Sequence, residues 1–434
     1  MSLSVCQPRK RVAVIGAGAA GLAALRHTSC RPEVFEVMCF EQSAVIGGTW
    51  VYNDDVGTDQ YGLPVHSSMY KNLRTNLPKE AMAFPDFPFE KDGRSFLKHE
   101  EVLDYLEKYA DHFNLKKYIK FLTEVKHVDP VKDGHGGVTW NIKVKDVRVA
   151  DDTSDSSFVA DAVIVCNGYG VLGRMHFNGS LTKFEGQVIH SHDYRVPEAF
   201  ANKVVCCVGC GASGQDIALE VASKAKQVYL SHNKPALSTS LPDNLSQTSG
   251  IVELTADGGM MKNGQKLEFD VLLLCTGYHY SFPFLSANCH VNIDDGRVTP
   301  LYKHIVHTEF PTLFFIGICT KLCPFPQFHN TVKFILATLD GTFQLPPKED
   351  MMAEEQREFE WRLKKGYAHR HAHLMGPLQW DYFNELADLG KYERLPKAVQ
   401  NLFDEIHRTR CNDLQNYRNI NYQITGPETF EVRY

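Results

Sequence analysis

Residues 11–27 read RVAVIGAGAAGLAALRH, and residues 204–222, VVCCVGCGASGQDIALEVA, repeat the same plan. In each stretch a short β-branched apolar run precedes three glycines and then apolar residues at helical spacing. This order predicts a strand, a tight turn and a helix, in which the first glycine turns the chain and the second admits a pyrophosphate. The third lets the helix pack closely on the strand, and the helix N-terminus attracts phosphate charge. The chain is therefore expected to contain two Rossmann-like dinucleotide-binding domains of the α/β class.

The first glycine loop is followed by an acid at a spacing that suits ribose recognition. The loop residues expected to contact a dinucleotide are Gly16, Gly18, Ala19, Ala20 and Gly21. The next apolar run, VFEVMCF, ends at Glu41, and Gln42 follows it. A carboxylate at this strand end accepts hydrogen bonds from ribose hydroxyls. An exposed strand-end acid is the ordinary alternative, but the spacing favours Glu41 as a ribose ligand.

The second glycine loop has no such acid. Its glycines are Gly209, Gly211 and Gly214. The strand after it ends at Ser231, and His232 and Lys234 follow. A carboxylate there would repel a 2′-phosphate, whereas these side chains can accept one, so the second site favours NADPH over NADH. Two different sites in one chain predict an FAD that stays bound at the first loop and an NADPH that exchanges at the second.

Two buried strands that end in glycine and tyrosine, at 158–170 and 269–280, flank the second loop. They read as two crossings between the same pair of domains, which predicts that one domain is inserted into the other. The predicted FAD domain comprises residues 1–167 plus 284–434, and the predicted NADPH domain comprises residues 168–283. Within 140–165 we expect two strands around an acidic turn that carries Asp151, Asp152 and Asp155. From about residue 348 onward the pattern predicts helices.

The composition excludes several other classes of protein. The chain has 434 residues, of which 43% are hydrophobic and 23% charged, as in globular proteins. The net charge is −6 and no long lysine or arginine run occurs, so nucleic acid is not expected as a partner. We find neither an apolar leader nor a run long enough to span a membrane, which predicts a cytoplasmic protein without integral membrane association.

The cysteines and histidines are not expected to form disulfides or a metal site. The twelve cysteines are scattered, mostly in apolar strands, and are predicted to be reduced packing residues. His369, His371 and His373 alternate, but a zinc site usually draws on cysteine or carboxylate as well. We expect these three histidines to form a solvated patch.

Further motifs make the class more specific. IGGTW spans residues 46–50, MYKNLRTNLPKEAMAFPDFPF spans 69–89, FxGxxxHxxxYR spans 184–195, and CTGY spans 275–278. Together with the two loops, this set resembles the flavin-containing monooxygenases over about residues 8–350. Tyr194 stands where the related Baeyer–Villiger enzymes carry tryptophan, so the chain is most similar to the members that oxygenate nitrogen and sulfur. Its length and lack of a membrane tail resemble the soluble insect branch, which includes N-oxygenases of pyrrolizidine alkaloids such as senecionine.

The resemblance implies an NADPH- and O2-dependent monooxygenase whose chemistry is carried by FAD through a flavin C4a-hydroperoxide. A soft nucleophile such as a tertiary amine or a sulfide would take one oxygen atom, and a homo-oligomer is compatible with the family. The resemblance places Asn76 beside the flavin as the catalytic amide, and it treats His190 and Tyr194 as architectural. The other cofactor contacts that it implies are Gly48, Thr49, Trp50, Thr75, Leu77, Ser213, Gly214, Gln215, Ser231, His232, Thr276 and Gly277.

Two departures and two alternatives accompany this resemblance. Many family members carry arginine where His232 stands and glutamine near the position of Thr331, so one phosphate contact and one flavin or substrate contact differ. A Cys207-x-x-Cys210 pair also suggests an FAD/NADPH disulfide reductase, but Cys210 lies inside the glycine loop, where the dithiol of those reductases does not lie. The second alternative is a non-catalytic nucleotide-binding regulator, which predicts poor FAD retention or no NADPH oxidation.

Overall fold

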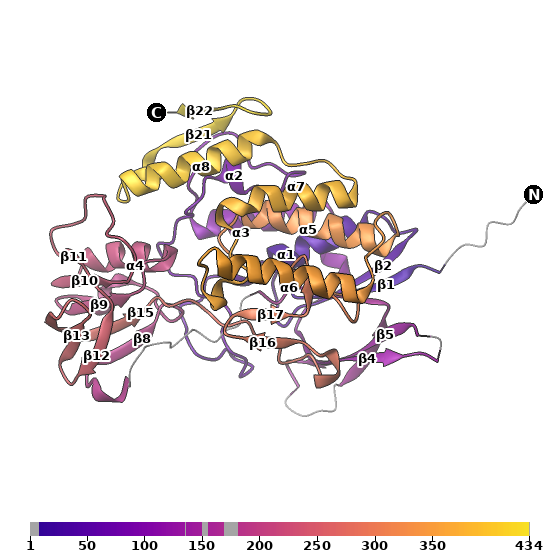
Figure 1. The fold of residues 1–434 in the computed structure, drawn as a ribbon, viewed down its shortest axis with the longest axis horizontal. Helices are drawn as coiled ribbons and strands as arrows, with labels where there is room; N and C mark the ends of the chain where they lie inside the picture. Colours follow the sequence, from indigo (N-terminus) through magenta and orange to yellow (C-terminus); the bar gives the residue numbers. More distant parts are fainter. Residues whose placement is uncertain (1–7, 135, 150–154, 169–180, 434) are drawn as a thin grey trace, which may run out of the picture.

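Two parallel sheets, one next to each glycine loop, organise the structure (Figure 1). The computed structural model describes residues 8–134, 136–149, 155–168 and 181–433. Its α-helices are α1 (Ala19–Ser29), α2 (Lys79–Met82), α3 (His99–His112), α4 (Ala212–Ala222), α5 (Pro324–Leu339), α6 (Lys348–Lys364), α7 (Gln379–Gly390) and α8 (Lys397–Asn412).

The first glycine loop belongs to a seven-stranded sheet. Its strands lie in the order β18 (Leu301–Tyr302), β19 (Val306–His307), β20 (Leu313–Phe315), β7 (Ala162–Val165), β1 (Lys10–Ile15), β2 (Phe35–Phe40) and β3 (Ile119–Lys120). The five strands from β20 to β3 are parallel, and β18 and β19 add an antiparallel edge. A parallel sheet needs cover on both faces, because its strands are apolar on both sides.

The side chains of β1 show how the two faces are covered. Val12 and Val14 pack into one cluster with residues of α1, α3, α5 and α7. Ala13 and Ile15 point the other way, toward an antiparallel sheet of β4 (Thr123–Lys132), β5 (Val138–Asp146) and β6 (Ser156–Ala160). The alternation follows from the two-residue repeat of a strand, so the four apolar residues of this strand supply two separate cores.

The second glycine loop belongs to a five-stranded sheet with the same layering. Its strands lie in the order β11 (Leu245–Thr248), β10 (Gln227–Ser231), β9 (Val204–Val208), β15 (Val271–Leu274) and β8 (Gln187–His190), and all are parallel. Cys207 and Leu273 pack against α4 on one face. Cys206 and Leu272 pack on the other face against the antiparallel sheet of β12 (Ile251–Thr255), β13 (Gly258–Met261) and β14 (Lys266–Glu268).

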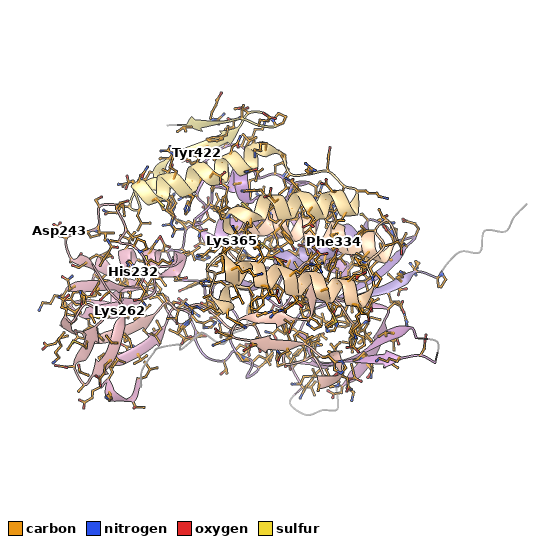
Figure 2. All side chains as sticks on the ribbon, in the orientation of Figure 1. His232, Asp243, Lys262, Phe334, Lys365 and Tyr422 are labelled. Carbon is orange, nitrogen blue, oxygen red and sulfur yellow. The ribbon has the colours of Figure 1, made fainter. Side chains whose placement is uncertain are left out.

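The two lobes interleave along the chain. Every strand of the second sheet and of its antiparallel cover lies between residues 187 and 274, whereas the first sheet takes strands from before and after that stretch. In Figure 1 the five-stranded sheet with α4 forms one lobe, and α1, α5, α6 and α7 lie together in the other. Figure 2 labels His232 and Lys262 on the first of these lobes and Phe334 on the second. The α/β fold with two Rossmann-type domains is thus confirmed, and the boundaries at 167/168 and 283/284 stay a prediction.

The expected pair of strands within 140–165 is wrong in one respect. The structure has three strands there, because β6 and β7 separate at Asp161 and enter different sheets. The Asp161 carboxylate accepts hydrogen bonds from the backbone N–H and the guanidinium of Arg11, which fixes the break. Asp151 and Asp152 of the predicted acidic turn lie outside the described residues.

The expectation of helices from residue 348 onward holds for α6, α7 and α8 and fails at the end of the chain. There a hairpin of β21 (Asn421–Ile424) and β22 (Phe430–Arg433) forms around a turn at Gly426. Tyr422 is buried and its backbone N–H donates to the Ser95 hydroxyl, so the hairpin docks on the FAD-side lobe. Among the described residues, no helix is both long and apolar enough to cross a membrane.

Candidate dinucleotide and substrate site

The two glycine loops have the same backbone geometry. Gly16 has φ +98° and Gly209 has φ +109°, a conformation that glycine alone adopts without strain. A Cβ on Gly16 would lie 2.7 Å from the carbonyl oxygen of Cys166, and one on Gly209 would lie 2.5 Å from that of Cys275. Each first glycine therefore turns the chain directly against the end of the neighbouring strand.

The other glycines of the loops divide their roles as the pattern predicts. A Cβ on Gly21 or Gly214 would overlap the carbonyl oxygen of the first glycine of its own loop, so these positions bring helix and strand together. A Cβ on Gly211 would meet no atom within 4 Å, and Ser213 next to it is exposed at the start of α4. This open space at a helix N-terminus fits the pyrophosphate of a dinucleotide.

Glu41 is fixed against the first loop by backbone donors. Its carboxylate accepts the N–H of Ala17 at 2.7 Å and the N–H of Ser43 at 2.8 Å. Burial raises the pKa of Glu41, although these N–H groups oppose that shift. An ionised carboxylate can accept about four hydrogen bonds, so both oxygens retain capacity for ribose hydroxyls. Gln42 follows on the loop and is half-buried.

The GGTW turn lies against the first loop. Gly47 pairs with Gly18 in a short bridge, and a Cβ on Gly48 would lie 3.0 Å from the Gly18 Cα. Only a residue without a side chain permits this approach. Thr49 is exposed and Trp50 is half-buried. The structure therefore brings Gly48, Thr49 and Trp50 to the loop that also holds Ala19 and Ala20.

Asn76 presents a free amide on a fixed backbone. The side chain of Asn76 is exposed, and no hydrogen bond of its amide occurs to any described residue. Thr75 beside it is buried. The Leu97 N–H donates to Thr75 Oγ1 at 3.0 Å, and the Thr75 N–H donates to the Leu97 carbonyl at 2.8 Å. Leu77 is half-buried and leads into Pro78 at the start of α2.

Arg418 connects this segment to the second nucleotide lobe, which the sequence analysis missed. Its Nε donates to the Thr75 carbonyl at 3.0 Å, and its NH1 pairs with Asp216 of α4 at 2.5 Å. The other Asp216 oxygen accepts the hydroxyl of Tyr70. Arg418 comes from the C-terminal segment and lies in no recognisable motif, so only the fold shows this role. It sets the position of the Asn76 backbone relative to α4.

The polar side chains at the strand end of the second site are bonded within the protein. Ser231 is fully buried and its hydroxyl donates to the Ser249 carbonyl at 3.0 Å, so this hydroxyl is used inside the protein. His232 Nε2 lies 3.2 Å from Gln247 Oε1, which also accepts the Leu237 N–H. Because Gln247 Oε1 can only accept, Nε2 is the donor and the buried Nδ1 has no partner among the described residues.

Two cations from separate segments form hydrogen bonds at the second loop. Lys234 Nζ donates to the Cys210 carbonyl at 2.9 Å, inside the loop itself. Burial, and to a lesser extent the charge of Lys234, lowers the pKa of Lys321. Arg410 of α8 donates to Gln215 Oε1 at 2.7 Å. Positive charge at this loop fits the phosphates of NADPH.

The FxGxxxHxxxYR motif is architectural in its geometry. Arg195, buried at 8% exposure, donates to five backbone carbonyls, which belong to Asn53, Asp55, Ser67, His192 and Tyr194. Tyr194 is completely buried and packs edge-on against Tyr70. The His190 ring meets Tyr278 at a centroid distance of 5.4 Å. The motif therefore joins the segment around residues 53–70 to the second lobe.

A cavity of about 270 Å³ lies where the two parallel sheets end. Its wall is formed by Thr276, Gly277, Tyr278, Tyr280, Gly296, Thr320 and Arg370. Thr276 and Gly277 directly follow the second sheet at Cys275, the residue that touches Gly209, and Thr320 follows β20 of the first sheet. Ligands of open α/β sheets bind beyond the carboxyl ends of the strands, and this cavity occupies such a position for both sheets.

The cysteines behave as packing residues. All eleven described cysteines are free, and nine of them are buried. Burial raises the pKa of Cys207 to about 12, which disfavours a reactive thiolate. Cys210 accepts a contact from Gln215 Nε2 at 3.4 Å within the glycine loop. Nothing in this geometry supports the dithiol of a disulfide reductase.

The expectation of a solvated histidine patch is wrong for His373. This residue is 5% exposed, and its ring accepts the Val298 N–H and lies 2.9 Å from His304 Nδ1. Residues 369–371 form a short 3-10 helix, so His373 turns inward instead of alternating along a strand.

Thr331 is completely buried, in α5, and accepts a hydrogen bond from Gln327 at 3.1 Å. Gln327 thus lies one helical turn before Thr331, the position near which the family tends to carry a glutamine.

One side-chain cluster has the composition of a metal site. Donor atoms of His27, Asp86 and His329 lie within 4.8 Å of one another. Arg26 already pairs with the Asp86 carboxylate at 3.2 Å, and burial lowers the pKa of His27 to about 3. The cluster is a hydrogen-bonded contact between α1, the 84–89 segment and α5.

The loops, the carboxylate at one site and the cations at the other define a flavoprotein with a second, nicotinamide dinucleotide site. The comparisons with known proteins agree. The model of the flavin-binding monooxygenase-like family matches residues 9–240 and 236–431. The chain is 40% identical over 446 residues to flavin-containing monooxygenase FMO GS-OX-like 4 of Arabidopsis thaliana, covering 96% of this chain and 93% of that protein.

Two solved structures are similar over nearly the whole chain. S-allyl-L-cysteine S-oxygenase from Allium sativum has a TM-score of 0.86 at 36% identity and covers 96% of both chains. Tmm from Pelagibacter sp. strain HTCC7211 has a TM-score of 0.84 at 27% identity, over 97% of this chain and 95% of that chain. The chain belongs to the flavin-containing monooxygenase family and is a monooxygenase that uses FAD and NADPH. Membership rules out the disulfide reductase, and the likeness to the insect branch stays a prediction.

Proposed function

We propose that this chain transfers one atom of O2 to a small sulfide, and secondarily to a tertiary amine, while NADPH is oxidised and the second oxygen leaves as water. The observation that carries the proposal is the free amide of Asn76, held between the two nucleotide lobes by Arg418. The similarity to an S-allyl-L-cysteine S-oxygenase supports sulfur over nitrogen. Pyrrolizidine alkaloids remain the second candidate, on the resemblance to the insect branch.

The residues would divide the work as follows. Reduced FAD, when bound, supplies the activation of O2. Gly16, Gly18 and Glu41 would hold its pyrophosphate and ribose, and the loop at Gly209–Gly214 with Lys234 would hold NADPH. Asn76 would donate a hydrogen bond to the reacting oxygen and keep the site ordered. Since the cofactor carries the hard step, the site needs orientation and exclusion of water more than an acid–base pair.

The test is rapid mixing of the purified, NADPH-reduced protein with oxygenated buffer, in the absence of substrate. We expect a transient absorbance between the bands of reduced and oxidised flavin that lasts for seconds. Thioanisole or trimethylamine should then shorten its lifetime and yield sulfoxide or N-oxide. Immediate return to oxidised flavin with release of peroxide would contradict the proposal, and absence of NADPH oxidation would leave the non-catalytic regulator.

Asn76→Ala tests the role of the amide. Product formed per NADPH should fall about 10²-fold, the usual size for loss of one preorganised donor, while the rate of flavin reduction changes less than about twofold. Asn292→Ala, at an exposed position of β16 (Asn292–Asp294), is the matched control and should couple normally. Unchanged coupling in Asn76→Ala would remove this residue from the mechanism.

A further inference from the structure

Arg370 is the charged residue in the wall of the 270 Å³ cavity. It lies in the histidine-rich segment AHRHAHLMG, which the predicted function does not use. Its side chain is exposed, and no hydrogen bond or ion pair joins it to any residue in the described part of the chain. A guanidinium has five N–H donors in a planar fork, so all of them are available to a ligand.

The backbone that carries Arg370 is fixed to the first lobe on one side. Thr320, another residue of the cavity wall, donates its N–H to the His373 carbonyl at 2.9 Å and accepts the Met375 N–H at 2.9 Å. These two bonds join the segment after β20 to the segment after Arg370. The segment that follows Arg370 is therefore bonded to the Thr320 wall of the cavity.

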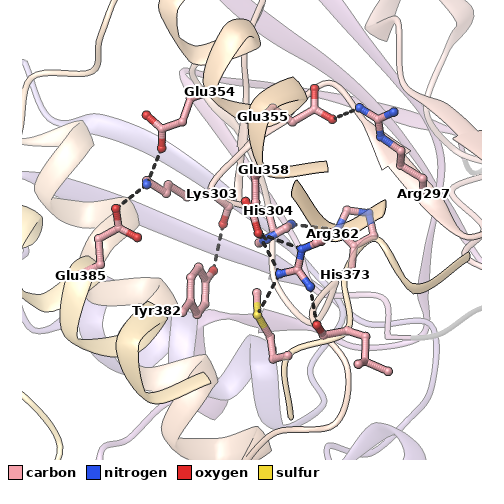
Figure 3. Close-up of polar contacts among 12 residues, drawn as sticks. Arg297, Lys303, His304, Glu354, Glu355, Glu358, Arg362, His373, Tyr382 and Glu385 are labelled. Carbon is pink, nitrogen blue, oxygen red and sulfur yellow. Dashed lines mark hydrogen bonds and ion pairs between the residues drawn. The ribbon is translucent and has the colours of Figure 1, made fainter. Parts of the chain in front are cut away.

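A buried polar network fixes the same segment from the other side (Figure 3). His373 accepts the Val298 N–H at 2.8 Å and contacts His304 at 2.9 Å. His304 Nε2 lies 3.1 Å from Glu358 of α6, and Arg362 donates to the same carboxylate and to the Leu374 carbonyl. Val298 belongs to β17 (Arg297–Thr299), directly after Gly296 of the cavity wall.

The network fixes the backbone segment that follows Arg370. Residues on both sides of the cavity, near Gly296 and near Thr320, are bonded to the segment that starts at Arg370. A side chain on such a support loses less freedom when it binds a ligand than one on an untied loop, which favours binding. A partner-free cation at the rim of a preformed cavity thus reads as a recognition group.

The rest of the wall defines the kind of ligand. Tyr278 and Tyr280 are the aromatic residues of the cavity wall, and aromatic side chains suit an apolar arm of the substrate. The Tyr280 hydroxyl donates to the Ile318 carbonyl at 2.5 Å, so its ring is held in place. At about 270 Å³ the cavity is near the lower end of small-molecule sites, which begin at about 300 Å³.

We propose that Arg370 binds the carboxylate of the substrate, so that this enzyme prefers S-substituted amino acids or comparable anionic sulfides over neutral ones. This inference rests on the proposed oxygenation and specifies its substrate class. A guanidinium and a carboxylate form two parallel N–H···O bonds, which orient as well as attract the ligand. The apolar arm with its sulfur then lies along Tyr278 and Tyr280, toward the carboxyl ends of the two sheets.

The test compares S-allyl-L-cysteine with S-allyl-L-cysteinamide, which keeps the sulfur and the ammonium group and lacks the carboxylate. In Arg370→Gln we expect kcat/KM for the acid to fall about tenfold, mainly through KM, because a charge-assisted bidentate pair is lost. The kcat/KM for the amide and for thioanisole, and the KM for NADPH, should change less than about twofold. Arg370→Lys should restore part of the loss for the acid. Arg408→Gln, an exposed arginine on α8, is the matched control.

Equilibrium binding separates this inference from the proposed function. Titration of the FAD-loaded protein with S-allyl-L-cysteine, followed by ligand NMR, should show weaker binding to Arg370→Gln than to wild type. Equal loss for acid and amide, or no loss for either, would overturn the role of Arg370. A rise in the KM for NADPH alone would assign Arg370 to the nucleotide instead. Arg370-dependent binding without any sulfide oxygenation would overturn the proposed function and keep the anion site.

Discussion

The two glycine loops share one backbone and differ in the charge around it. Gly16 and Gly209 turn the chain with nearly the same φ, and each meets the end of the adjacent strand. The first loop then faces the buried carboxylate of Glu41, whereas the second contacts Lys234, with Arg410 bonded to Gln215 at the start of α4. The comparison teaches that one loop geometry serves both sites, and that the charge brought to it by other residues is negative at the first loop and positive at the second.

The largest expected effect on cofactor binding comes from adding a side chain at the first glycine of each loop. Gly16→Val should reduce FAD content to less than about a tenth of wild type, because the strained φ opposes the native loop by about 1–3 kcal/mol and a Cβ would also overlap Cys166 O. Gly209→Val should keep FAD and lose reduction by NADPH. Flavin absorbance and anaerobic reduction distinguish the two variants, and circular dichroism confirms that both fold. Loss of FAD in both would show that the loops do not act separately.

Glu41→Gln tests the carboxylate that sets the first loop apart. The dissociation constant for FAD should rise about 10–100-fold, as a hydrogen bond to a charged acceptor contributes about 1.5–3 kcal/mol. Fluorescence titration of the apoprotein measures it. Glu36→Gln, at an exposed acid on the same strand β2, should bind FAD as wild type does.

The raised pKa of Glu41 adds a pH dependence to this prediction. As the pH falls through that raised pKa, the carboxylate takes up a proton earlier than an ordinary glutamate, and its affinity for ribose hydroxyls is lost. Wild-type FAD binding should therefore weaken on acidification, and Glu41→Gln should lack this component. The same slope in both proteins would place the titrating group elsewhere.

Lys234→Met tests the opposite charge at the second loop. The KM for NADPH should rise about fivefold, since a partly exposed ion pair contributes up to about 1 kcal/mol. The KM for NADH should change less than twofold, as it has no 2′-phosphate. Lys262→Met, on the same lobe in Figure 2, is the control. Equal changes in KM for both nucleotides would indicate that Lys234 contacts the pyrophosphate and not the 2′-phosphate.

The smallest expected effect is that of Cys210→Ala, which gives the second loop the Gly-Ala-Gly order of the first. Cys210 is buried and lies between two glycines, and alanine fits the same position at Ala17. We expect kcat/KM for NADPH to stay within about twofold of wild type. Loss of flavin reduction with FAD retained would give the thiol a role that its burial does not suggest.

Much of the fold could be predicted because its signals are local. The strand, glycine loop and helix at 11–27 and 204–222 each form within a single stretch of chain. The split of β6 from β7 at Asp161 could not be predicted, since it depends on a carboxylate reaching Arg11 some 150 residues away. The burial of His373 depends in the same way on Val298 and His304, which come from other segments.

Some residues of the candidate site could likewise be predicted from local sequence, and others could not. Glycine positions, the acid at Glu41 and its absence after Ser231 are visible in the sequence, because loop geometry needs particular residues at particular spacings. The sequence by itself therefore determined the class of fold, the two nucleotides and the family. Only the tertiary structure decided that Arg418 ties the segment of Asn76 to α4, that Arg410 joins Lys234 at the second loop, and that Arg370 lines a cavity. These side chains come from distant segments that packing alone brings together, and no spacing along the chain records such contacts.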